Sequence, residues 1–89
     1  MNGGMKGMKA LVYVTLKPSV LDPQGKAVLH ALHSLGYKEV EDARVGKMIE
    51  LSLTGHDKDG AAKRVAAMCE TLLANTVIET YRFEIVEER

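Results

Sequence analysis

The sequence predicts a small α+β domain, a two-layer sandwich in which both helices cover one face of a four-stranded antiparallel sheet. Three observations lead to this fold class. Strand-like apolar runs stand near both ends of the chain, two helical stretches carry apolar stripes, and a Gly-Lys pair interrupts a strand-like stretch in the middle. The 89 residues suffice for one hydrophobic core and are too few for two. The expected order of elements is therefore β-α-β-β-α-β.

The first strand is predicted at residues 9–16. Its sequence, KALVYVTL, is rich in β-branched and apolar residues on both faces, which is typical of a central strand. Pro18 ends it, because proline has no N–H for a ladder hydrogen bond. Residues 1–7 are glycine-rich and lack periodicity, so we expect a flexible tail there and a single domain over residues 8–87.

The first helix is predicted to begin after Asp22 and to run to about Leu35. Aspartate is a favourable N-cap, and Pro23 stands at the first helical position, where its missing N–H has no consequence. Gly36 suits the left-handed residue that commonly ends a helix. One face of this helix is apolar at the spacing i, i+3, i+4 and i+7: Val28, Ala31, Leu32 and Leu35.

Residues 38–54 predict two strands joined by a hairpin turn at Gly46-Lys47, since a Gly-X pair suits a type II′ turn. A second helix is expected from about Asp59, as its aspartate cap, to Ala74, with Asn75 as its C-terminal cap. A last strand follows at residues 76–86, where apolar and charged residues alternate. This order is that of a ferredoxin-like sandwich.

The sheet face away from the helices is predicted to carry Leu11, Tyr13 and Met48. Packing this face against another copy of the chain would bury these side chains, so we expect a homodimer or a dimer of dimers. The alternative is that they are scattered apolar surface residues, which are common on soluble proteins.

The composition argues against several function classes. Lysine plus arginine number 12 and aspartate plus glutamate number 12, so no net charge attracts nucleic acid or an anionic membrane. No apolar run approaches the roughly 20 residues of a membrane span, and the N-terminus lacks a signal-peptide core, so we expect a cytoplasmic protein. The single cysteine excludes an internal disulfide and a cysteine-rich metal site.

No complete catalytic or metal-binding constellation is found in the sequence. Cys69 lies on the apolar stripe of the second helix without a histidine one turn away, which favours a buried structural thiol. His30 and His33 could share a metal, but no further ligand is suitably spaced. The segment GHDKDG resembles the outline of a phosphate loop, yet no GK[ST] follows it. We therefore expect neither catalytic nor metal-ligating residues in this chain.

Three blocks carry a family resemblance: VTLKPSVLDPQGKAVLHALHSLGY, EDARVGKMIEL and MCETLLANTVIETYRFEI. Together they closely resemble the PurS family, the small subunits of phosphoribosylformylglycinamidine synthase, over roughly residues 8–86. The resemblance implies an enzyme of purine biosynthesis made of three proteins. A glutaminase subunit, PurQ, releases ammonia from glutamine, and a large subunit, PurL, uses ATP and magnesium to make the amidine.

For this chain the resemblance implies a non-catalytic piece without a cofactor of its own, which holds PurL and PurQ together so that ammonia passes between them. The alternative is a ferredoxin-like regulatory domain that binds a small molecule. The residues expected to contact a partner or ligand lie in the opening loop and on the predicted hairpin: Lys17, Asp22, Gln24, Gly25, Arg44, Gly46 and Lys47. For Arg44 and Lys47 a partner protein, a nucleotide and a solvated hairpin all remain open.

Overall fold

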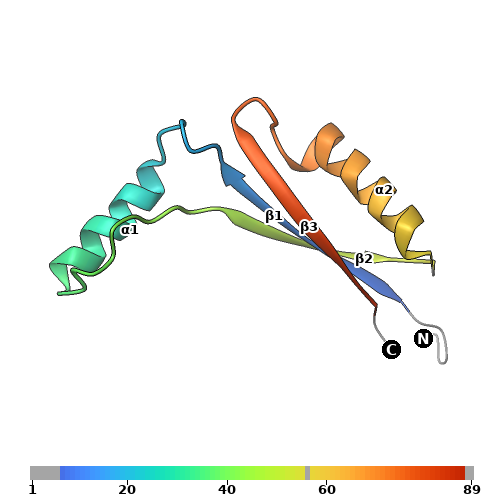
Figure 1. The fold of residues 1–89 in the computed structure, drawn as a ribbon, viewed down its shortest axis with the longest axis horizontal. Helices are drawn as coiled ribbons and strands as arrows, with labels where there is room; N and C mark the ends of the chain where they lie inside the picture. Colours follow the sequence, from blue (N-terminus) through green and yellow to red (C-terminus); the bar gives the residue numbers. More distant parts are fainter. Residues whose placement is uncertain (1–6, 56, 88–89) are drawn as a thin grey trace.

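The computed structural model describes residues 7–55 and 57–87; residues 1–6 of the predicted tail and His56 of the GHDKDG segment lie outside this description. Its elements follow in the order β1 (Met8–Leu16), α1 (Pro23–Ser34), β2 (Lys47–Leu53), α2 (Lys58–Met68), a short π-helix η1 (Cys69–Leu73) and β3 (Glu79–Glu87) (Figure 1). None of the described helices is long and apolar enough to cross a membrane.

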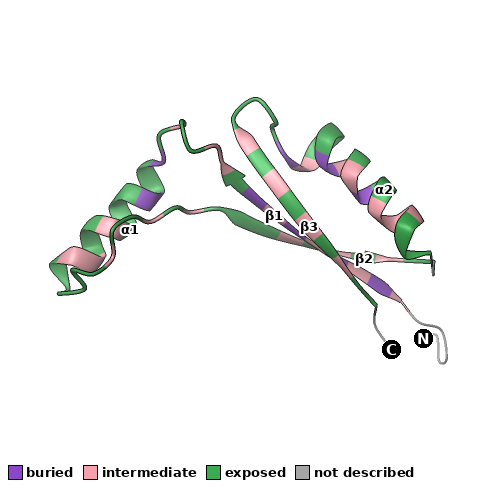
Figure 2. Cartoon of the chain, viewed as in Figure 1, coloured by how far each residue is buried: buried purple, intermediate pink, exposed green. Residues whose placement is uncertain are grey.

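The sheet is antiparallel, with β1 in the centre between β2 and β3, as the apolar character of residues 9–16 predicts. From Met8 to Val14 the side chains of β1 alternate between buried and half-buried (Figure 2). The buried set faces α2, whose Val65 is fully buried together with Cys69 at the start of η1. The core is therefore one sheet face under one helix, and its strand members are Met8, Ala10, Val12 and Val14.

The predicted fourth strand is wrong. Residues 40–46 form no regular secondary structure, so the described chain has three strands and no hairpin at Gly46-Lys47. A type II′ turn needs positive φ at its first central residue, and among the described glycines only Gly36 and Gly55 adopt positive φ. The chain therefore runs straight through Gly46 into β2 instead of reversing. The ferredoxin-like arrangement is not reproduced within one chain.

The predicted placement of both helices on one sheet face is also wrong for this chain. Only α2 lies on the sheet, whereas α1 projects beyond its end (Figure 1). The molecule consequently extends over 51 × 29 × 17 Å. The apolar stripe of α1 is mostly uncovered by its own chain: Val28 is 42% exposed and Leu35 74%, although Leu32 is half-buried.

The two ends of α1 follow the prediction. Asp22 caps its N-terminus and Pro23 is its first residue. At the C-terminus Gly36 has φ +103°, its N–H donates to the His33 carbonyl at 3.0 Å, and the Tyr37 N–H donates to the Leu32 carbonyl at 2.9 Å. This pair of hydrogen bonds is a Schellman motif.

The ends of α2 differ from the prediction. The helix begins at Lys58, with Asp57 rather than Asp59 at the N-cap, and it continues beyond Met68 as the π-helix. Asn75 is not a left-handed cap, because no described non-glycine residue has positive φ. It instead begins the turn into β3, where its carbonyl accepts from the Glu79 N–H at 2.7 Å. That turn delays the last strand to Glu79.

Candidate functional site

The candidate site is the neck, which we define as residues 17–25 and 43–47, where the chain leaves the sheet for α1 and returns from it. All residues predicted to contact a partner or ligand lie in this neck: Lys17, Asp22, Gln24, Gly25, Arg44, Gly46 and Lys47. The structure thus brings two distant sequence blocks together at one end of the sheet (Figure 1).

Asp22 joins the two sides of the neck. The residue is only 4% exposed. One carboxylate oxygen accepts from the Gly25 N–H at 2.9 Å, as an N-cap does, and the other accepts from the Val45 N–H at 2.9 Å. The Arg44 Nε lies 4.0 Å from the second oxygen. A residue predicted as a helix cap therefore also anchors the returning segment.

These hydrogen bonds, from Val45 first and then from Gly25, and the nearby Arg44 charge keep the pKa of Asp22 below its ordinary value, although burial opposes them. A carboxyl with a lowered folded-state pKa stabilises the fold above its unfolded-state pKa and loses this contribution as pH falls through the folded-state value.

We expect the difference in melting temperature between the protein and its Asp22→Asn variant to stay constant between about pH 5 and 7. It should shrink below about pH 4, where the unfolded carboxyl begins to titrate. Melting curves of both proteins, recorded from pH 3 to 7, measure this difference in melting temperature. A difference that grows toward low pH would contradict the ionised, hydrogen-bonded state of Asp22.

Two glycines allow the two sides of the neck to approach closely. A Cβ atom on Gly25 would lie 2.3 Å from the Ala43 carbonyl oxygen, and one on Gly46 would lie 2.5 Å from the Val14 carbonyl oxygen. Both neighbours are backbone atoms, which cannot rotate away as a side chain can. The sequence predicts Gly46 for a turn, whereas the structure uses it for close packing.

Arg44 is bound within the neck rather than projecting from a hairpin tip. Its Nη2 donates to the carbonyl of Lys17 at 2.9 Å and lies 3.3 Å and 3.4 Å from the carbonyl oxygens of Leu16 and Val20. The guanidinium thereby links the end of β1 and the β1–α1 loop through their carbonyl groups. Contact of Arg44 with a partner or nucleotide stays a prediction.

Gln24 and Lys47 line an open pocket of about 240 Å³ at the neck, together with Asp22, Gly46 and Glu79. Both side chains are exposed, and neither has a hydrogen bond or ion pair with the described part of the chain. With the half-buried Lys17, whose carbonyl oxygen accepts from Arg44, they are the predicted residues best placed to meet another molecule.

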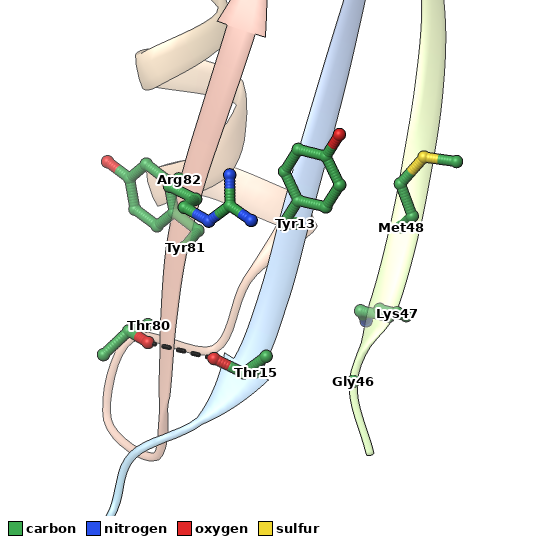
Figure 3. Close-up of a pocket in the computed structure, with 8 residues that line it drawn as sticks. All are labelled: Tyr13, Thr15, Gly46, Lys47, Met48, Thr80, Tyr81 and Arg82. Carbon is green, nitrogen blue, oxygen red and sulfur yellow. Dashed lines mark hydrogen bonds between the residues drawn. The ribbon is translucent and has the colours of Figure 1, made fainter. Parts of the chain in front are cut away.

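The outer face of the sheet holds residues that sequence reasoning missed (Figure 3). The Arg82 guanidinium stacks on Tyr13 at 4.2 Å from the ring centre, and the Thr15 and Thr80 hydroxyl groups lie 3.3 Å apart. These cross-strand pairs depend on the β1–β3 register, which the sequence does not reveal. Because Arg82 covers Tyr13 and Leu11 is half-buried, this face is less apolar than predicted, although Met48 is 54% exposed.

The remaining chemical candidates have structural surroundings. Cys69 is fully buried, and burial raises the pKa of its thiol, which agrees with the predicted structural cysteine. The Tyr81 hydroxyl donates to Glu70 at 2.7 Å, and this hydrogen bond raises the pKa of Tyr81. The Nε2 of His33 lies 2.6 Å from the Val40 carbonyl oxygen. Within residues 7–55 and 57–87, no three His, Cys, Asp or Glu side chains are grouped to hold a metal ion.

Comparison with protein families gives a match over residues 9–87 to the PurS family model, described as phosphoribosylformylglycinamidine (FGAM) synthase. The chain belongs to the PurS family. A PurS subunit of this synthase from Bacillus subtilis is 60% identical over 79 residues, covering 89% of this chain and 93% of the relative. A PurS subunit from Synechocystis is 55% identical over 74 residues, covering 83% of this chain and 74% of the relative.

Solved PurS structures share the fold. The B. subtilis PurS structure has a TM-score of 0.75 at 59% identity, covering 88% of this chain and 96% of that one. A structure described as PurLQS from Thermotoga maritima contains a chain with a TM-score of 0.82 at 30% identity, covering 90% of this chain and 98% of that one. The family resemblance found in the sequence is therefore confirmed, and so is the α+β class.

Proposed function

We propose that this chain is the non-catalytic bridging subunit of phosphoribosylformylglycinamidine synthase in the cytoplasm. In this complex it holds the PurQ glutaminase and the PurL synthetase, which together make formylglycinamidine ribonucleotide from formylglycinamide ribonucleotide, glutamine and ATP. ATP and magnesium act through PurL. One observation carries the proposal: 90% of the chain matches the fold of a component of the T. maritima PurLQS structure.

The shape of the chain suits this role. Bridging contributes by orienting two active sites, so that ammonia released at one is used at the other before it escapes to water. An extended molecule with a projecting helix offers separate surfaces to separate partners (Figure 1). In the proposal Lys17, Gln24 and Lys47 contact PurL or PurQ from the neck.

Self-association is part of the proposal, and two incomplete surfaces support it. On the core face, α2 leaves Tyr81, Phe83 and Ile85 of β3 only partly buried. On α1, the apolar stripe with Val28 and Leu35 is exposed. A helix on the open part of the core face would complete the two-layer sandwich that the sequence predicts, and the α1 of a second copy has the required apolar stripe.

Charge supports the same pairing. Between Pro23 and Ser34, α1 has no acidic residue and carries Lys26, His30 and His33. The partly buried Tyr81 of the core face donates to Glu70 on η1, so an acidic side chain lies beside this face, and Glu79 precedes Tyr81 by two residues on the same strand face. In a twofold dimer each copy would give its α1 and receive the other, so that both cores are completed. This interface differs from the outer sheet face expected from the sequence.

Sedimentation velocity of the mixed subunits tests the bridging proposal. We expect PurL and PurQ to sediment together only when this chain is added. A Lys17→Ala, Gln24→Ala, Lys47→Ala variant should weaken this assembly about tenfold or more, because interface residues at charged contacts typically contribute at this scale.

The matched control removes three long polar side chains from exposed positions of α2, through Lys58→Ala, Lys63→Ala and Arg64→Ala. It should assemble like the unmodified chain. A complex of PurL and PurQ that forms equally well without this chain would contradict the proposal.

A further inference from the structure

The hydrogen bonds of the neck belong to the extended arrangement of α1. In the hairpin that the sequence predicts, a two-residue turn at Gly46-Lys47 would place Arg44 opposite Ile49, inside the sheet. Arg44 instead reaches the carbonyl group of Leu16, the last residue of β1, and those of Lys17 and Val20 beyond it. This contact requires the returning segment to run past the end of the sheet beside the β1–α1 loop.

Asp22 reinforces the same path. Its carboxylate accepts one hydrogen bond from its own helix, at Gly25, and one from the returning segment, at Val45. The first bond orients the helix start and the second fixes that start to the chain entering β2. Since both partners are backbone groups, the carboxylate sets the direction of α1 relative to the sheet.

The sequence itself permits two chain paths after α1. A reversal at Gly46 would let α1 fold back onto the core face of its own sheet, and a straight path sends α1 away from it. Glycine is compatible with both paths. The side chains that distinguish them in the structure are those of Asp22 and Arg44, because their hydrogen bonds cross between the two sides of the neck.

We infer that Asp22 and Arg44 are positioning residues that lock α1 in its extended direction and so keep its apolar stripe available to another molecule. The lock acts through contacts inside the chain and needs no partner. Its consequence for assembly rests on the proposed function, in which a second copy receives α1. Loosening it should let α1 sample other directions, including a closed form on its own sheet.

Distance measurements between two spin labels test the lock directly. The labels are placed on exposed residues of α1 and β2 through Ala27→Cys and Ser52→Cys, while the native Cys69 is buried and escapes labelling. Dilution with unlabelled chain restricts the measurement to distances within one chain. The unmodified neck should give one narrow distance distribution.

Asp22→Asn and Arg44→Gln are the test variants. Asparagine remains a good N-cap, and its side-chain oxygen can still accept from the Gly25 N–H. The NH2 group that replaces the second carboxylate oxygen is only a donor, so it cannot accept from the Val45 N–H. The matched control is Asp57→Asn, at the N-cap of α2, where the side chain makes no capping hydrogen bond. We expect both test variants to lose the single narrow distance and to gain a shorter component, whereas the control keeps it.

Circular dichroism verifies that α1 and the sheet remain folded. If Asp22→Asn does not fold, Arg44→Gln alone decides, because Arg44 is exposed and outside the core. Narrow, unchanged distances in the folded test variants, measured at a concentration at which the chain is monomeric, would overturn the inference. If the distances respond but the chain never associates with PurL and PurQ, the lock stands and the proposed function fails.

Discussion

Replacing Gly25 with alanine is expected to lower the free energy of unfolding of the assembled protein by about 2 kcal/mol, even though alanine is the better helix former by about 1 kcal/mol. The added Cβ would lie 2.3 Å from the Ala43 carbonyl oxygen and 2.7 Å from the Asp22 carboxylate. Either the helix start or the returning segment must move, and the Asp22 hydrogen bonds are then lost. Urea denaturation followed by circular dichroism measures the change.

Gly60→Ala provides a closely matched control. Gly60 is the third residue of α2, as Gly25 is of α1, and each follows an aspartate N-cap by three positions. The nearest atom to a Cβ on Gly60 belongs to the exposed Asp57 side chain at 2.9 Å, which can rotate away. This substitution should be neutral or stabilise by up to about 1 kcal/mol. Equal effects of the two substitutions would refute the close packing of the neck.

The double substitution Val28→Asp, Leu35→Asp is expected to raise the dissociation constant of self-association by at least 100-fold. Burial of one such side chain contributes about 1.5–3 kcal/mol, and each lost contact occurs twice in a twofold dimer. Every 1.4 kcal/mol corresponds to a factor of ten in affinity. Analytical ultracentrifugation over a concentration series measures the constant. The helix itself should persist, because neither side chain is buried within its own chain.

The control moves the same two aspartates by one residue each, to Ala27→Asp and Ser34→Asp. Both positions are exposed and lie off the apolar stripe, and the added charge is the same. Charge repulsion from the acidic side chains beside the core face should weaken the control variant's self-association, but much less than loss of the apolar contacts weakens that of the stripe variant. If the control variant dissociates as readily as the stripe variant, charge rather than apolar contact governs self-association. The proposal that each copy receives the other's α1 would then be wrong.

Local features of this fold could be predicted from the sequence. The central position of β1 follows from its apolar residues on both faces, and Asp22, Pro23 and Gly36 mark the ends of α1. These predictions succeed because each depends on a few neighbouring residues. The placement of α1 failed because a helix with an apolar stripe looks the same whether its own sheet or another molecule covers it.

The fourth strand failed for a different reason. Gly46 suits a hairpin turn, but a hydrogen bond from Val45 to Asp22, 23 residues earlier, draws the segment along another path. No local pattern encodes that contact. Residues 38–42 also contain Lys38, Glu39, Glu41 and Asp42, which are poor strand formers.

The sequence predicts the candidate residues on two separate features, the opening loop and a hairpin, and not their meeting in the neck. Their contact with a partner stays a prediction. Asp22, Gly25 and Gly46 serve contacts within the chain, however, which leaves Lys17, Gln24 and Lys47 for partners. The Arg82–Tyr13 stack was missed because it depends on the register of two strands that are distant in sequence.

The most direct test of the bridging role compares two nitrogen sources in the reconstituted synthase. PurL and PurQ are supplied with ATP, magnesium and formylglycinamide ribonucleotide, and amidine formation is followed with glutamine or with ammonium chloride, each with and without this chain. The proposal predicts that omitting the chain removes most glutamine-dependent synthesis while ammonia-dependent synthesis changes little. Equal glutamine-dependent rates with and without the chain would contradict it.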